Sequence, residues 1–160
     1  MNHRKITSII LHCTASAATA TLTPEALDTY HRSLGWAGCG YHYYITCDGQ
    51  IHPMRDIEKA GAHAKGFNAS SIGIAYEGGL DARNRPADTR TEAQRRSLET
   101  LLRYLLLVYP RTQILGHRDL SPDLNGNGTI EPAEWIKVCP CFNAATEYRD
   151  LIKQQQYITK

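Results

Sequence analysis

Residues 116–142 read GHRDLSPDLNGNGTIEPAEWIKVCPCF, and this run holds more candidate metal ligands and charged groups than any other part of the chain. It begins where an apolar, strand-like segment delivers His117, and it continues through an acidic, Asn-rich loop. It ends with Lys137, which stands two residues before Cys139. Because a metal site takes its ligands from several segments of a fold, we expect the rest of the chain to supply partners for these residues.

The composition is that of an ordinary globular protein with one core. Of the 160 residues, 42% are hydrophobic and 21% are charged, and no Pro-, Ser- or Gly-rich tract marks a linker. A chain of this length buries roughly two thirds of its unfolded surface on folding. We therefore expect a single domain that spans residues 1–160.

Charge and hydropathy argue against two classes of protein. The formal net charge is only +2 and the Lys and Arg residues are scattered, which disfavours a nucleic-acid-binding protein. No run of roughly 20 apolar residues is present, so we expect no membrane span.

The basic start MNHRK leads into an apolar run that Thr7 and Ser8 interrupt, which favours cytoplasmic synthesis without a signal peptide. No heptad pattern or unexplained apolar helix face is visible, which favours a monomer.

Three segments have the pattern of strands, and two of them end in histidine. Residues 6–14, ITSIILHCT, are β-branched and apolar on both faces, as in a central strand that ends near His12. The segment QILGH is apolar until it reaches His117, and residues 71–76, SIGIAY, form the third strand. Because side chains alternate along a strand, His12 and Cys13 are expected on opposite faces of the sheet.

The remaining local signals complete an α/β pattern. Residues 41–52 predict a hairpin that turns at an Asp-Gly pair. Helices are predicted to begin after Thr23 and after Thr91, the second through a capping box with Gln94, and residues 143–155 predict a polar C-terminal helix. The expected fold is therefore α/β, a single domain with a central mixed β-sheet flanked by α-helices.

Three candidate zinc ligands stand in separate segments. His12 and His117 end two predicted strands, and Cys139 belongs to a tight Cys-Pro-Cys segment. Two imidazoles and one thiolate leave a fourth position open, which is the pattern of a catalytic rather than a closed structural zinc site. Histidines at strand ends are also common as structural residues, so the spacing alone leaves both interpretations open.

The five cysteines form an odd set, so a complete disulfide framework is excluded. We expect reduced and mostly buried thiols, although pairing of Cys39 with Cys47 beside the hairpin stays open. Cys141 is close enough in sequence to compete for a metal ion. Pro140 stiffens the backbone between the two cysteines, and we assign the metal to Cys139.

Five segments of the chain together resemble one enzyme family. They are LHCTAS, GYHYYITCDG, HAKGFNASSIGIAYEGG, GHRDLSP and KVCPCF, and they follow one another in this order through nearly the whole chain. In this combination they resemble the zinc-dependent N-acetylmuramoyl-L-alanine amidases of the phage-endolysin type, the family that also includes peptidoglycan recognition proteins. The agreement of several separate segments is far more specific than any one of them.

The resemblance implies both a site and a reaction. It places zinc on His12, His117 and Cys139, with Tyr41 and Lys137 beside the metal. It implies hydrolysis of the amide bond between the lactyl group of N-acetylmuramic acid and the L-alanine of the stem peptide, in peptidoglycan or muropeptides. Lys137 is then expected to hold the oxyanion, and Tyr41 to add a donor or to orient the water.

Details of the resemblance indicate a branch, a groove and a rival function. The cytosolic recycling branch usually has Asp as third ligand and Glu in the strand where this chain has Cys139 and Ala75, which favours the endolysin branch, acting on the cell wall after release. His63 matches a position that lines the family's substrate groove, and a loop histidine without a role fits the sequence equally well. The alternative function is a non-catalytic peptidoglycan-binding module, against which Cys139, Tyr41 and Lys137 together argue.

The segment DLNGNGTIEPAE, residues 123–134, is an insertion with the spacing of an EF-hand calcium loop. Its candidate ligands are Asp123, Asn125, Asn127, the carbonyl of Thr129 and Glu134, with Gly128 at the sixth position. Because only two of these side chains are charged, calcium binding would be of the weak extracellular kind. The alternative is an Asn/Gly-rich turn without metal, since no ordinary helix precedes the loop.

Overall fold

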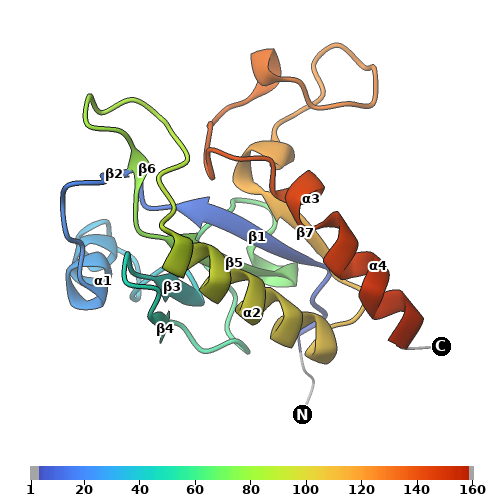
Figure 1. Ribbon diagram of the computed structural model, residues 1–160, viewed down its shortest axis with the longest axis horizontal. Helices are drawn as coiled ribbons and strands as arrows, with labels where there is room; N and C mark the ends of the chain where they lie inside the picture. The colour runs from blue at the N-terminus through green and yellow to red at the C-terminus, as the bar shows by residue number, and fades with distance from the viewer. Residues whose placement is uncertain (1–3, 159–160) are drawn as a thin grey trace.

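A five-stranded sheet lies at the centre of the protein in the computed structural model, which describes residues 4–158 (Figure 1). Its strand order is β4-β3-β5-β1-β7. The strands are β1 Ser8–Cys13, β3 Tyr43–Ile45, β4 Ile51–Pro53, β5 Ser71–Tyr76 and β7 Gln113–Gly116. β1 is parallel to β5 and β7, and β3 is parallel to β5, whereas β3 and β4 form the predicted antiparallel hairpin. The mixed sheet that the sequence predicts is confirmed.

The strand register aligns the ends that carry the candidate ligands. Leu11 of β1 pairs with Gly116 of β7, and His12 pairs with Ala75 of β5. Because these strands are parallel, His12 and His117 arrive at the same edge of the sheet, beyond the carboxyl ends where open α/β sheets carry their sites. Cys13 packs into the core cluster beneath α2, so His12 lies on the opposite face.

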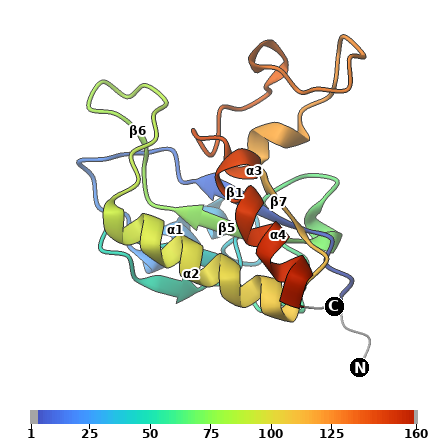
Figure 2. The same cartoon turned by 45° about the vertical axis from the view of Figure 1, so that its right-hand side comes forward.

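Helices cover both faces of the sheet. α2 (Glu92–Val108) packs on one face, and α4 (Arg149–Ile158) lies beside it in both views (Figures 1 and 2). On the other face, Leu27 of α1 (Pro24–Ser33) joins a small cluster with Tyr44 and Ala75. The remaining short elements are β2 Ser16–Ala17, β6 Gly79–Leu80, α3 Ala144–Glu147 and three 3-10 helices, Asn68–Ser70, His117–Leu120 and Pro132–Glu134. Within residues 4–158, no helix combines the length and apolar character needed to cross a membrane.

The predicted caps are present at both long helices. The Thr91 hydroxyl accepts a hydrogen bond from the Gln94 amide at 3.1 Å, and the Gln94 side chain accepts one from the Thr91 amide at 2.9 Å. The Thr23 hydroxyl accepts from the Ala26 amide at 3.1 Å. These side chains satisfy amides that the first helical turn leaves without partners.

Two predicted elements need correction. The strand predicted to include His117 ends at Gly116, because the Asp119 carboxylate accepts the Gly116 amide hydrogen at 2.7 Å and a 3-10 helix begins at His117. The predicted C-terminal helix divides at Tyr148 into α3 and α4. It is also less polar than expected, because Tyr148 and Leu151 are buried in the core.

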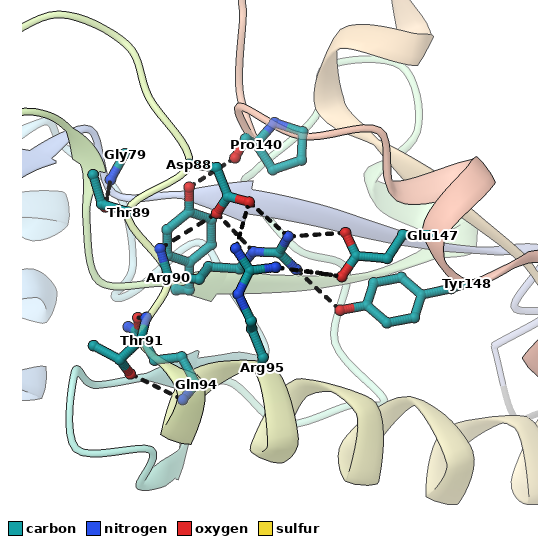
Figure 3. Close-up of polar contacts among 11 residues, drawn as sticks. Gly79, Asp88, Thr89, Arg90, Thr91, Gln94, Arg95, Pro140, Glu147 and Tyr148 are labelled. Carbon is teal, nitrogen blue, oxygen red and sulfur yellow. Dashed lines mark hydrogen bonds and ion pairs between the residues drawn. The ribbon is translucent and has the colours of Figure 1, made fainter.

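A buried ion network joins the segment before α2 to the C-terminal segment (Figure 3). The Arg90 side chain is 0% exposed, and its Nη2 lies 2.9 Å from both Asp88 Oδ2 and Glu147 Oε2. Its Nη1 donates to the Tyr148 hydroxyl at 3.1 Å, and its guanidinium carbon lies 3.3 Å from the centroid of the Phe142 ring. The network therefore anchors the chain just after Cys139.

Replacing Arg90 tests how much this network stabilises the fold. Arg90→Gln is expected to lower the free energy of unfolding by about 2 kcal/mol, because Asp88 and Glu147 lose their buried partner and keep only the partly exposed Arg95. Urea unfolding followed by circular dichroism measures the loss. Arg103→Gln is the matched control, since Arg103 pairs with Glu99 on an exposed face where both side chains are 50% exposed, and it should cost less than about 0.5 kcal/mol. Equally small losses in the two variants would contradict the assigned role.

Candidate metal centre

The structure brings the three predicted ligands into one cluster. The ligand atoms of His12, His117 and Cys139 all lie within 4.8 Å of one another. The Cys139 sulfur is 3.8 Å from His12 Nδ1, and the rings of His12 and His117 are 4.7 Å apart at their centroids. Ligand atoms that share one tetrahedral zinc ion lie about 3.3–3.8 Å apart, given bond lengths of about 2.0–2.3 Å. Among residues 4–158, this is the one group of three or more His, Cys, Asp or Glu side chains with that capacity.

Hydrogen bonds from two main-chain amides hold Cys139 beside His12 and His117. The Arg118 amide, next to His117, donates to the Cys139 carbonyl at 2.8 Å. The Cys13 amide, next to His12, donates to the Cys139 sulfur at 3.2 Å. The position of the thiol is therefore tied to the strand ends that carry the histidines.

The turn that carries Cys139 also packs closely on the sheet. The Tyr76 hydroxyl of β5 donates to the Pro140 carbonyl at 2.8 Å, inside the core. At Gly116, a Cβ atom would lie 2.6 Å from Pro140 Cδ, so the absence of a side chain lets the proline ring approach β7. Neither Tyr76 nor Gly116 carries a sequence signal for this role, because both contacts are with a residue distant in the chain.

Both candidate histidine ligands are held in the neutral form. Burial, followed by the neighbouring His63 and His117, lowers the pKa of His12 well below its ordinary value. Burial, followed by the charge of Lys137, lowers the pKa of His117 to about 4. A neutral imidazole keeps the lone pair that a metal ion requires, so both rings are ready as ligands at neutral pH.

The remaining cysteines lie outside the ligand cluster. The Cys141 sulfur is 4.0 Å from the Cys13 sulfur and 3.5 Å from the Gly79 carbonyl oxygen, on the core side of β1. Cys39 is buried, Cys47 is partly exposed, and all five thiols are free. The geometry therefore agrees with Cys139 rather than Cys141 as the third ligand, and Cys39 and Cys47 are not paired.

The two predicted catalytic side chains lie beside the cluster. The Tyr41 ring is 5.1 Å from the His12 ring, and burial, together with the neighbouring Cys139, raises the pKa of Tyr41, which keeps its hydroxyl protonated as a donor. Lys137 is exposed, and it lies close enough to His117 for its charge to act on that ring. Both side chains can therefore donate to a group bound at the centre.

A groove of 570 Å³ opens beside the cluster, with His117 and Lys137 in its wall. His63 also lines the groove but is only 9% exposed, and its Nδ1 lies 2.9 Å from Nε2 of His12. Trp36 and Phe67 are the large aromatic side chains of the wall, exposed by 38% and 40%. The direct contact between His63 and a candidate ligand has no sequence signal.

The predicted calcium loop closes on itself through two carboxylates. Asp123 accepts the amide hydrogens of Gly126 and Gly128, each at 2.7 Å. Glu134 accepts those of Leu124 at 2.8 Å and Glu131 at 2.9 Å, one on each carboxylate oxygen. The side-chain oxygens of Asn125 and Asn127 accept amide hydrogens from two residues further on. Main-chain amides thus occupy the side-chain oxygens of four predicted calcium ligands, Asp123, Asn125, Asn127 and Glu134.

Comparisons with known proteins find relatives over most of the chain. The model of the N-acetylmuramoyl-L-alanine amidase family matches residues 2–134. The chain is 31% identical to the endolysin of Klebsiella phage KP32 over 140 residues, covering 88% of this chain and 83% of that protein. It is 49% identical to a Haemophilus influenzae protein described as uncharacterized, over 96 residues that cover 60% of this chain and 83% of that one.

Solved structures show the same relationship. The N-acetylmuramoyl-L-alanine amidase LysC from Clostridium intestinale superposes with a TM-score of 0.70 at 32% sequence identity, and the match covers 96% of this chain and 86% of that chain. Drosophila PGRP-LB shares the fold at 21% identity, with a TM-score of 0.66 over 91% of this chain and 81% of that chain. The family match and the phage relative together identify the chain as a member of the N-acetylmuramoyl-L-alanine amidase family.

Proposed function

We propose that the protein hydrolyses the amide bond between N-acetylmuramic acid and the L-alanine of the stem peptide, with zinc held by His12, His117 and Cys139. One observation carries this proposal: the two imidazoles and the thiol form a three-ligand cluster beside a groove. Family membership supplies the substrate class, which is peptidoglycan or its muropeptide fragments.

The donor set fits zinc. Two neutral imidazoles and one cysteine are borderline-soft ligands of the kind that zinc prefers, and three protein ligands leave a fourth position for water or substrate. A zinc ion at such a site supplies a water of pKa near 7 and polarises the carbonyl that is attacked.

Lys137 and Tyr41 supply the remaining chemistry. An exposed ammonium in the groove wall can stabilise the negative charge that develops on the carbonyl oxygen as the amide is attacked. The protonated Tyr41 hydroxyl can donate a hydrogen bond to the attacking water or to the same oxygen. Since His63 lines the groove, a contact with substrate is part of the proposal.

The rival function is a peptidoglycan-binding module that does not cut. The joint presence of Cys139, Tyr41 and Lys137 at one site favours hydrolysis, because binding alone does not require a thiolate ligand or an oxyanion donor.

We further propose that the protein acts in the cell wall after release, as endolysin relatives imply. We also propose that it acts as a monomer.

Purified sacculi decide between cutting and binding. The protein is expected to release new L-alanine amino termini, to lose this activity with a zinc chelator, and to regain it when zinc is added. Cys139→Ser should lower the rate by about a hundredfold or more, because it removes a metal ligand. Cys47→Ser, a free thiol away from the cluster, is the control and should retain the rate. Zinc-loaded protein that releases no amino termini from any wall type would exclude the enzyme.

Lys137 is tested separately from metal binding. Lys137→Ala is expected to lower kcat by about a hundredfold, as for the loss of one oxyanion donor, while the zinc content stays at the wild-type value. Lys153→Ala in α4 is the matched control, because Lys153 is also an exposed lysine and does not line the groove. An unchanged kcat in Lys137→Ala would refute the oxyanion role.

For residues 123–134 we propose weak calcium binding by Asp123, Asn125, Asn127, Thr129 and Glu134, supported by their spacing. A bound ion would replace the main-chain amides on the two carboxylates, and the expected Kd is about 10⁻⁴–10⁻³ M. Calorimetry at millimolar calcium should show heat in the wild type and none in Glu134→Gln. Absence of heat in the wild type, with a melting curve that calcium does not move, would refute the proposal.

A further inference from the structure

His63 lies between a candidate metal ligand and a buried serine. Its Nδ1 is 2.9 Å from His12 Nε2, and its Nε2 is 3.3 Å from Ser71 Oγ. The three side chains are almost inaccessible, with Ser71 at 0%, His12 at 2% and His63 at 9% exposure. These contacts therefore lie in the protein interior. Which nitrogen or oxygen carries the hydrogen in each contact is set by the other hydrogen-bond partners of His12, His63 and Ser71.

The hydrogen bond between Ser71 and His63 can have only one donor. Ser71 Oγ lies 2.8 Å from the Phe67 carbonyl oxygen, which can only accept a hydrogen bond. Since a hydroxyl carries a single hydrogen, that hydrogen goes to Phe67, and the Ser71 oxygen is left as an acceptor. His63 Nε2 must then carry the hydrogen of the 3.3 Å contact.

The proton on His63 Nε2 also decides which atom donates in the contact between His63 and His12. Two ring nitrogens 2.9 Å apart share one hydrogen, and a His63 that is protonated on Nε2 offers Nδ1 as the acceptor. The buried His63 ring contacts His12 and Ser71 through its two nitrogens, so no carboxylate of the described residues lies beside it to balance the charge of a second proton. His12 Nε2 therefore donates, and the lone pair of His12 stays on Nδ1, the atom that faces Cys139 at 3.8 Å.

Packing gives the His63 ring one orientation. A Cβ atom at Gly73 would lie 2.6 Å from His63 Cγ, and one at Gly61 would meet the ring edge. The His42 ring packs edge-on at 5.8 Å between centroids and itself accepts the Gly73 amide hydrogen at 3.0 Å. The ring is thus confined by backbone on two sides, which opposes the ring flip that would put Cδ2 and Cε1 where Nδ1 and Nε2 lie now.

We propose that His63 is a positioning residue that, with Ser71, holds His12 in the tautomer whose Nδ1 lone pair faces Cys139 and His117. The inference rests on the proposed metal site and assigns His63 a role beyond substrate contact. Groups that hydrogen-bond the second ring nitrogen of a ligating histidine fix its tautomer and ring orientation, and their loss usually weakens metal binding about 10- to 100-fold. A residue that contacts only substrate would leave metal affinity unchanged.

The tautomers are read directly in the metal-free protein. Long-range ¹H–¹⁵N correlation spectra distinguish Nδ1–H from Nε2–H for each ring, and we expect Nε2–H for both His12 and His63. In Ser71→Ala we expect the rings of His12 and His63 to populate a mixture of the two tautomers. Ser97→Ala, which also removes a hydroxyl that donates to a main-chain carbonyl, should leave both rings unchanged. Nδ1–H on either ring of the wild type would overturn the proposal.

Zinc affinity gives an independent readout. In competition with a chromophoric chelator, His63→Leu should bind zinc about 10-fold or more weakly than the wild type. His63→Asn should recover most of the affinity, because the Asn side-chain oxygen can accept the His12 Nε2 hydrogen where Nδ1 does now. Wild-type affinity in a folded His63→Leu would overturn the positioning role.

Failure of the two proposals can be told apart. A wild-type protein that binds no zinc refutes the proposed metal site, while the tautomers of His12 and His63 in the same sample still decide the positioning role. If His63→Leu does not fold, the wild-type spectra and the Ser71→Ala and Ser97→Ala pair carry the decision.

Discussion

The candidate metal centre depends on how one turn, the turn at Cys139, is tied to the ends of two parallel strands. The amides that tie it belong to Cys13 and Arg118, and each directly follows a candidate histidine ligand. The peptide units that position the histidines therefore also position the sulfur. Cys13 and Cys139 are 126 positions apart in the chain, so the site exists only in the folded sheet.

Around this tie, each ligand segment has a second support from the interior. Tyr76 holds the peptide after Cys139, Asp119 holds the amide before His117, and His63 contacts the ring of His12. Further out, the Arg90 network fixes the chain beyond Phe142. Tyr76, His63 and Arg90 are buried and hydrogen-bonded, the kind of support that can orient the ligands of a metal site before an ion binds.

The local part of the fold was predictable from the sequence. The buried runs of β1 and β5, the hairpin and the Thr91 capping box are signals within a few residues, and each is confirmed. The gathering of His12 and His117 was also predictable, because the carboxyl ends of parallel strands meet at one edge. Cys139 was a candidate from its Cys-Pro-Cys segment, and the family resemblance supplied its place beside the two histidines, which no periodicity could have given.

The supporting residues were beyond reach of sequence patterns. The pairing of Leu11 with Gly116 fixes which residues meet, and alternation along a strand does not reveal register between strands. Tyr76 and Arg90 act through partners far away in the chain, so a buried tyrosine and a loop arginine gave no local signal. The carboxylates of residues 123–134 had the spacing of calcium ligands, but spacing does not show whether amides or an ion occupy them.

The proposed function requires one zinc ion held by two histidines and the sulfur of Cys139. X-ray absorption at the zinc K edge, on protein loaded with one equivalent of zinc, measures these ligands directly. We expect one sulfur at about 2.3 Å with nitrogen or oxygen at about 2.0–2.1 Å, and loss of the sulfur in Cys139→Ser but not in Cys141→Ser. A wild-type shell without sulfur, or with two sulfurs, would contradict it.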